Sequence, residues 1–117
     1  MNVKKILMPT DFSDCAQAAL GHALFLAEQL EAELHLLHVI VVHQDDPFNP
    51  AYHFPDADEI YEQLQAAAAA GMKQLIEAHK DRRLDIVEAH RRGVAAAPEI
   101  VAYVQDQGID LVVLGAH

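Results

Sequence analysis

Short apolar runs alternate with segments of helical periodicity along the whole chain. Segments 6–8, 34–42, 85–91 and 109–114 have the length and apolar character of β-strands, whereas 43–55, with three prolines, looks irregular. The second strand is apolar at consecutive positions, which is typical of a strand covered on both faces of a parallel sheet. Strands that alternate with helices favour right-handed crossovers. The sequence therefore predicts an α/β fold, with an open parallel sheet wrapped by helices.

Three helices are expected between these strands. The first begins at Ser13 or Asp14, either of which can cap it, and the second covers 56–79. The third has Pro98 in its first turn and stops at Gly108. The expected apolar faces are Ala16, Leu20, Ala23, Leu24, Ala27 and Leu30 in the first helix, and Ile60, Leu64, Ala67, Leu75 and Ile76 in the second.

Composition limits the class of protein. At 117 residues the chain is expected to form a single domain, 1–117. Its formal net charge of −10 argues against sequence-independent binding to nucleic acid or anionic lipid, where basic residues supply most of the affinity. No apolar run approaches the roughly 20 residues of a transmembrane helix, and the start of the chain does not resemble a secretory signal. A lone Cys15 fits a reducing compartment, so a cytoplasmic protein is expected.

A ligand site is expected at one edge of the sheet. In open parallel sheets, ligands bind beyond the carboxyl ends of the strands, where the strand order reverses. Four segments occupy such positions: 9–11, 39–41, 92–93 and 115–117. Periodicity does not give the strand order, so it does not choose among them.

Three segments in register carry a resemblance to a known family. They are 6–13 (ILMPTDFS), 37–40 (LHVI) and 108–117 (GIDLVVLGAH). Each is a weak motif alone, but their order along the whole chain resembles the universal stress protein family. The resemblance implies a sheet with the strands ordered third, second, first, fourth, and a site between the first and the fourth.

The resemblance also implies roles for individual residues. In nucleotide-binding members, an acid at the position of Asp11 accepts hydrogen bonds from the adenosine, and the main chain at the position of Val39 meets the adenine. Pro9 and Thr10 would shape the same pocket. Gly115 matches the first glycine of a loop written G-x-x-G, nine residues, G-[ST], whose backbone N–H groups approach phosphate oxygens closely. Read by itself, Asp11 also suits an Asx-type turn.

The sequence departs from the family pattern after Gly115. It ends at His117, before the second glycine and the Ser/Thr of the loop, and before the last helix and fifth strand of the family. We therefore expect a C-terminally incomplete domain, with weakened phosphate binding and an unprotected strand edge at 111–114. The resemblance implies ATP as the ligand, with Mg²⁺ held mostly through phosphates and water, and a homodimer whose usual fifth-strand interface is missing.

Two hypotheses of different classes follow. The first is a stress-response regulatory protein that binds an adenine nucleotide at the carboxyl ends of the first and fourth strands. The alternative is a homodimeric interaction module of the same family that binds no nucleotide. The sequence contains neither of the glycine-rich nucleotide-binding motifs G-x-x-x-x-G-K-[ST] and G-x-G-x-x-G, no nucleophile elbow and no set of phospho-receiver acids. No enzymatic activity and no catalytic residue are therefore assigned.

Other chemically active side chains have simpler readings. His35 and His38 are three residues apart on a strand, so they are expected on opposite faces and cannot share an ion; no metal ligand is assigned. Arg91 and Arg92 could meet phosphates but suit surface charge better. Cys15 either packs as an inert residue or is activated by the helix start beside it.

Overall fold

The computed structural model describes residues 2–41, 57–79 and 84–115. Seven elements follow one another: β1 (Lys5–Pro9), α1 (Asp14–Leu30), β2 (Glu33–Val41), α2 (Ala57–Ala78), β3 (Ile86–Gly93), α3 (Ala96–Gln107) and β4 (Leu111–Val112). The predicted alternation of strands and helices is confirmed. The fourth strand is shorter than expected, and the segment predicted to be irregular, 43–55, lies outside the described residues.

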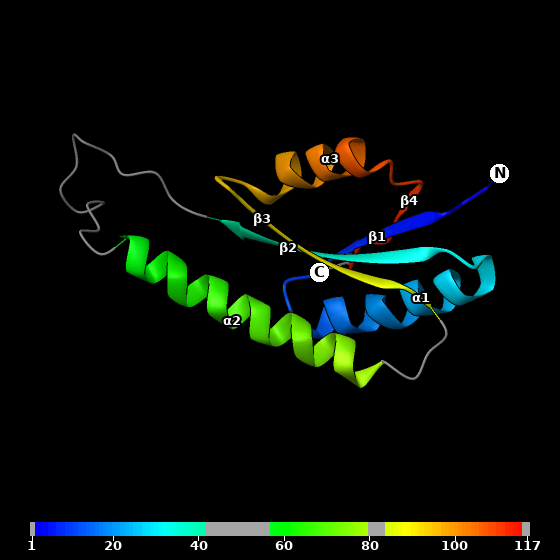
Figure 1. Cartoon of the computed structure of the whole chain (residues 1–117), viewed down its shortest axis with the longest axis horizontal. Helices are drawn as coiled ribbons and strands as arrows, with labels where there is room; N and C mark the ends of the chain where they lie inside the picture. Colours follow the sequence, from blue (N-terminus) through cyan, green and yellow to red (C-terminus); the bar gives the residue numbers. More distant parts are fainter. Residues whose placement is uncertain (1, 42–56, 80–83, 116–117) are drawn as a thin grey trace.

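The four strands form one parallel sheet in the order β3-β2-β1-β4. This is the order that the family resemblance implies. Ile6 of β1 lies opposite Leu34 of β2 on one side and Leu111 of β4 on the other. Helix α3 covers one face of the sheet, and α1 and α2 cover the other (Figure 1). The strand order reverses between β1 and β4, which places the switch point, where ligands bind in such sheets, at their carboxyl ends.

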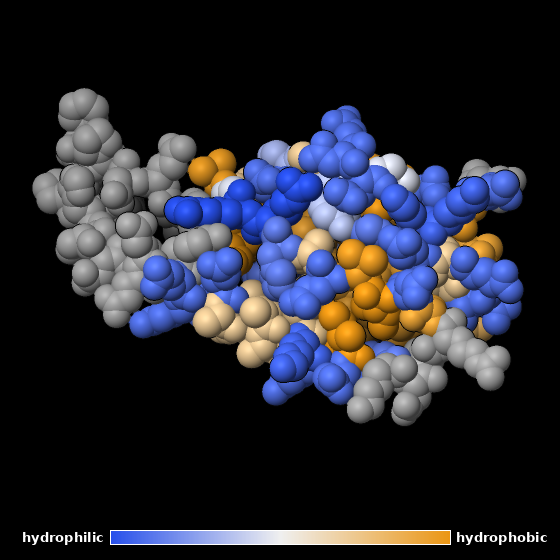
Figure 2. All heavy atoms as spheres, viewed as in Figure 1, coloured by the Kyte–Doolittle hydropathy of each residue, from blue (hydrophilic) through white to orange (hydrophobic). Residues whose placement is uncertain are grey.

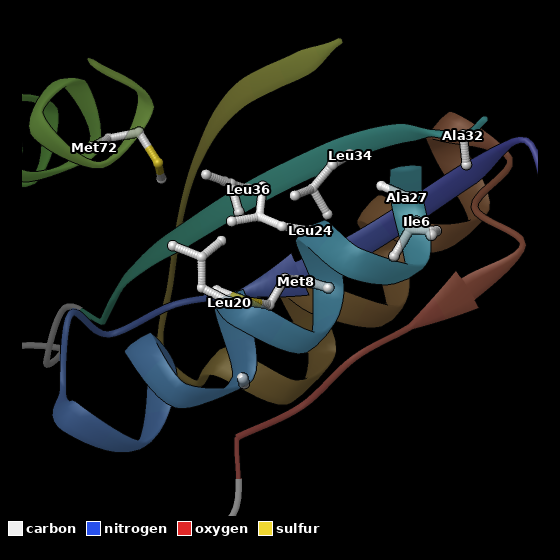
Figure 3. Close-up of a cluster of buried hydrophobic side chains, with 11 residues drawn as sticks. Ile6, Met8, Leu20, Leu24, Ala27, Ala32, Leu34, Leu36 and Met72 are labelled. Atoms are coloured by element: carbon white, nitrogen blue, oxygen red, sulfur yellow. The ribbon is translucent and has the colours of Figure 1, made fainter. Parts of the chain in front are cut away.

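The central strand β1 is buried on both faces, which explains its continuous apolar sequence. Ile6 and Met8 pack with α1, while Leu7 points to the other face and packs with Leu37 and Tyr103. Figure 3 shows the larger cluster, in which α1 lies along β1 and β2 and Met72 points in from α2. The core therefore has one layer on each side of the sheet.

Helix α1 begins and ends as its sequence indicates. The Ala16 N–H donates to the hydroxyl of Ser13, the cap residue, at 3.2 Å. The predicted apolar face is buried except for Leu30, which is 44 % exposed. Leu30 is the last residue of the helix, and Glu31 then turns the chain back toward β2 through a left-handed φ of 52°.

Helix α2 packs against the core through its second half, where the predicted Leu75 and Ile76 contact the buried cluster. The side chain of the predicted Ile60 lies outside the described residues. Ala68 and Met72 are buried, whereas Leu64 is 46 % exposed, so the expected placement of Leu64 and Ala67 on the packed face is wrong. The start of the helix extends past the ends of the four described strands (Figure 1). A repeat of apolar residues defines a helix face but does not show how much of a long helix has a partner.

The surface in the same view is mostly hydrophilic, with hydrophobic residues gathered over α1 and along α2 (Figure 2). Phe25, on α1, is 59 % exposed. Among the described residues, no helix combines the length and the apolar character required to cross a bilayer.

The start of β4 is fixed to the start of β1 by one side chain. The N–H groups of Lys4 and Lys5 donate to Asp110 Oδ2 at 2.9 and 3.1 Å. The Asp110 N–H in turn donates to the carbonyl of Lys5 at 2.9 Å. These bonds set the register of the short edge strand. In the part of the chain that the structure describes, no strand pairs with the other side of β4.

Candidate functional site

A pocket of about 350 Å³ lies at the carboxyl ends of β1, β2 and β4. Its volume is within the roughly 300–1,000 Å³ of small-molecule sites. The walls are Pro9, Thr10, Asp11, Ala16, Leu37, His38, Val39, Ala96, Ile100, Leu114 and Gly115. All five residues singled out from the sequence, Pro9, Thr10, Asp11, Val39 and Gly115, line this one pocket. The fold thus brings together three segments that are up to 106 positions apart in the chain, counting from Pro9 to Gly115.

Six lining residues were not among the predicted site residues: Ala16 lies in the first turn of α1, and the other five fall into two groups. Leu37, His38 and Leu114 adjoin predicted residues at strand ends, so the strand boundaries could have suggested them. Ala96 and Ile100 come from the start of α3, one helical turn apart. Nothing in the sequence indicates that this turn closes the pocket, because that depends on how α3 packs across the sheet.

The turn after β1 carries most of the polar groups. Thr10 is buried, and its N–H donates to the carbonyl of Leu37 at 2.8 Å. Its hydroxyl accepts from the Phe12 N–H at 3.1 Å, and Asp11 Oδ1 accepts from the Ser13 N–H at 3.0 Å. The Asx-type turn expected at Asp11 is therefore present. Asp11 is exposed, so its carboxylate is also accessible at the pocket rim.

The side chain of His38, on β2, contacts two residues of this turn, Thr10 and Phe12. His38 Nδ1 lies 3.0 Å from the carbonyl oxygen of Thr10, and its ring centroid is 4.9 Å from that of Phe12. Phe12 has a φ of 64°, in the left-handed region that residues with a side chain rarely adopt. His38 therefore has a hydrogen-bond partner in this turn.

Gly115 rests against the first turn of α1. A Cβ at this position would lie 3.1 Å from the carbonyl oxygen of Cys15 and 3.2 Å from its carbon. A side chain at such short distances would push the two backbone segments apart, so glycine permits the close approach. The end of β4 and the start of α1 thereby form one wall of the pocket. Cys15 itself is partly exposed.

A buried hydrogen-bond network occupies the opposite face of β2. His35 Nδ1 lies 2.6 Å from Tyr103 Oη, and His35 Nε2 lies 2.6 Å from Glu33 Oε1. The predicted placement of His35 and His38 on opposite faces is confirmed, since one contacts α3 and the other contacts Phe12. Burial raises the pKa of Tyr103 above its usual value of 10.0; the positive charge of Arg91 opposes this shift, and the negative charge of Glu33 adds to it.

The two arginines lie outside the pocket. The Arg91 guanidinium lies 5.3 Å from the centre of the Tyr103 ring and 3.4 Å from Asp106 Oδ2, so it packs on α3. Arg92 is exposed and does not line the pocket. Neither side chain is placed to meet a ligand there, which agrees with the surface-charge reading.

A larger depression of about 800 Å³ lies at the amino ends of the strands. Its charged groups, over the residues that the structure describes, are the carboxylates of Glu28, Glu31, Glu33 and Asp85 and the ammonium of Lys4. Four carboxylates repel an anionic ligand. Among the described residues, no group of three or more His, Cys, Asp or Glu side chains is arranged to hold a metal ion. The smaller pocket is therefore the better candidate site.

The chain is similar to universal stress proteins in both sequence and structure. It is 31 % identical over 124 residues to universal stress protein MJ0577 of Methanocaldococcus jannaschii, spanning 97 % of this chain and 76 % of that protein. It is 30 % identical to MJ0531 of the same organism, over 96 % of this chain and 64 % of that protein. The solved structure of UspA from Lactobacillus plantarum matches with a TM-score of 0.77 and 30 % identity, over 100 % of this chain and 79 % of that one.

Two more distant structures share the fold and hold a ligand. One is a universal stress protein in complex with cAMP, at a TM-score of 0.67 and 22 % identity over 97 % of this chain and 73 % of that one. The other is a family protein from Arabidopsis thaliana with AMP bound. It matches with a TM-score of 0.63 and 14 % identity, over 97 % of this chain and 76 % of that one. The family model for universal stress proteins matches residues 2–117. With the fold and two relatives in agreement, the chain belongs to the universal stress protein family.

Proposed function

We propose that this protein is a stress-response regulator that binds an adenine nucleotide in the pocket at the carboxyl ends of β1 and β4. The observation that carries the proposal is the convergence of Pro9, Thr10, Asp11, Val39 and Gly115 on one pocket at the switch point of the sheet. Two neighbours of the same fold hold cAMP and AMP, so this fold is compatible with an adenine nucleotide.

The chemistry of the pocket suits the nucleoside part of such a ligand. Leu37, Val39, Ile100 and Leu114 supply apolar walls, against which the faces of a purine can pack. The exposed carboxylate of Asp11 can accept hydrogen bonds from ribose hydroxyls. An apolar slot with one acceptor at its rim favours a nucleoside over a fully charged ligand.

The phosphates have fewer partners among the described residues. Gly115 lies against the first turn of α1, and the positive end of the helix dipole there favours negative charge. ATP, with Mg²⁺ held through its phosphates and water, remains the ligand implied by the family. We assign no protein ligand to Mg²⁺, and we expect the nucleoside rather than the triphosphate to supply most of the affinity.

The test is calorimetric titration of the full chain with AMP and with ATP. Asp11→Asn keeps an oxygen that can accept from the Ser13 N–H but removes the charge, whereas Asp11→Ala removes both. Losing a charge-assisted hydrogen bond should weaken AMP binding roughly tenfold or more in both variants. Arg92→Ala, which changes an exposed side chain outside the pocket, is the matched control and should bind as the parent does.

The outcomes separate the two hypotheses. Equal affinity of the parent and both Asp11 variants would contradict the role of Asp11. No binding of either nucleotide, together with a dimer of 12.9 kDa subunits in native mass spectrometry, would favour the homodimeric interaction module instead.

A further inference from the structure

We propose that His38 is a positioning residue whose imidazole N–H holds the Thr10 carbonyl and so shapes the turn that presents Asp11 to the pocket. The effect on nucleotide affinity rests on the proposed function, whereas the effect on the turn does not. His38 does not belong to the set singled out from the sequence, and its contact with the turn crosses from β2 to the end of β1.

The donor in this contact is fixed by its partner. A carbonyl oxygen can only accept a hydrogen bond, so Nδ1 of His38 must carry a hydrogen at 3.0 Å from the Thr10 oxygen. The neutral ring with its hydrogen on Nδ1 and the imidazolium both meet this requirement. The neutral ring with its hydrogen on Nε2 does not. The structure therefore specifies one tautomer of neutral His38.

Thr10 depends on β2 for both of its main-chain groups. Its N–H donates to the carbonyl of Leu37, and its carbonyl accepts from the next residue, His38. The backbone pairing of β1 with β2 ends at Pro9 and Leu37, so the side chain of His38 extends the attachment by one residue. Thr10 is only 6 % exposed, so without this donor its carbonyl has little access to water.

The shape of the turn beyond Thr10 needs such support. Phe12 has the left-handed φ of 64°, which a side chain disfavours and which surrounding contacts must maintain. Its ring centroid lies 4.9 Å from that of His38, and a Cβ at Gly71 of α2 would lie 3.2 Å from the same ring. His38 thus provides a hydrogen bond to Thr10 and an aromatic surface to Phe12. Asp11 lies between these two held residues.

Two substitutions separate the two contributions. His38→Asn keeps an N–H near the place of Nδ1 and removes the ring. His38→Phe keeps an aromatic ring and removes the donor. If the hydrogen bond positions the turn, Asn should preserve it and Phe should not. The same pair of variants would give the reverse order if only ring packing mattered.

The experiment uses nuclear magnetic resonance and AMP titration on the full chain. Without nucleotide, neutral His38 of the parent should show the Nδ1–H tautomer, and the Phe12 and Ser13 amides should exchange slowly with solvent. Exchange should stay slow in His38→Asn and become at least about tenfold faster in His38→Phe. AMP affinity should fall about tenfold in His38→Phe and by less in His38→Asn, which keeps the donor to Thr10.

The tautomer measurement needs no variant, so it decides the proposal even if a variant fails to fold. A neutral His38 with its hydrogen on Nε2 would overturn the proposal, as would His38→Phe with parental exchange and affinity. A parent that binds no AMP but shows the expected tautomer and exchange rates would overturn the proposed function alone. The positioning role of His38 in the turn would then stand.

Discussion

Tyr103 Oη lies 2.6 Å from His35 Nδ1, which joins α3 to β2 inside the core, where the two residues are only 4 % and 2 % exposed. The other ring nitrogen of His35 lies 2.6 Å from Glu33 Oε1. Since a carboxylate oxygen only accepts, His35 donates from Nε2, and in the neutral ring its Nδ1 accepts from the Tyr103 hydroxyl. Both buried ring nitrogens are therefore paired, and α3 is held over the pocket to which its first turn contributes.

Removing the hydroxyl of Tyr103 should leave His35 Nδ1 buried without a partner. We expect Tyr103→Phe to lower the free energy of unfolding by about 1–3 kcal/mol, measured by urea denaturation. The ring, and with it the contact to Arg91, is retained in this variant.

The double variant His35→Leu/Tyr103→Phe is the control for this interpretation. Replacing both partners by apolar groups leaves no buried nitrogen unpaired, so its loss of stability should be smaller than the sum of the two single losses. Strict additivity would show that the hydrogen bond contributes no coupling energy.

The pH dependence of Tyr103 follows from its environment. Its pKa in the folded state is raised above 10.0, chiefly by burial, so the folded protein holds this proton more tightly than the unfolded chain does. The resulting stability is fully present below pH 10.0 and is lost as the pH rises through the folded-state pKa. Urea midpoints measured across this alkaline range should fall less steeply in Tyr103→Phe than in the parent. Equal slopes would contradict the burial of the hydroxyl.

The parts of the fold that local patterning controls could be predicted from the sequence. The Ser13 cap, the left-handed Gly108 at the end of α3 and the buried run of β1 each follow from a few neighbouring residues. The strand order came from the family resemblance, because periodicity carries no information on which strands are neighbours. The short span of β4 was missed because apolar character continues past the last paired residue, Val112.

The candidate site also has a part that local sequence predicts and a part that it does not. Asp11 and Gly115 fall at strand ends that sequence motifs identify. The contribution of Ile100 and the hydrogen bond from His38 to Thr10 depend on contacts between elements far apart in the chain. Such contacts leave no local signal, so a single sequence read by itself contains nothing that would point to them.

The charge of Asp110 should stabilise the start of the sheet. The N–H groups of Lys4 and Lys5 hold the pKa of Asp110 below 3.8, so the unfolded chain binds this proton more readily. The stability that the charge contributes is therefore complete above pH 3.8 and is lost as the pH falls through the folded-state pKa. Asp110→Asn should be less stable than the parent at neutral pH, and the difference in urea midpoint should shrink in acid.

Asp106→Asn provides the comparison for Asp110. Asp106 is exposed, and its ion pair with Arg91 spans 3.4 Å, so its loss should change stability little. If the two asparagine variants were equally stable at neutral pH, the backbone contacts of Asp110 would have no special role.

Two glycines in helices test how closely Phe12 is packed against α2. Alanine is about 1 kcal/mol more favourable than glycine inside a helix. At Gly21 of α1 an added Cβ meets nothing within 4 Å, so Gly21→Ala should raise the free energy of unfolding by about that amount. At Gly71 of α2 the same Cβ would lie 3.2 Å from the ring of Phe12.

Gly71→Ala should therefore gain less stability than Gly21→Ala, because the ring of Phe12 must shift and its backbone is already in the left-handed region. The shift should appear as faster amide exchange at Phe12 and Ser13 in Gly71→Ala, with parental exchange there in Gly21→Ala. Equal stabilisation by the two alanines, with amide exchange in the turn unchanged, would mean that the Phe12 ring can move away from α2 at no cost in free energy. In that case α2 would have no influence on the turn that carries Asp11.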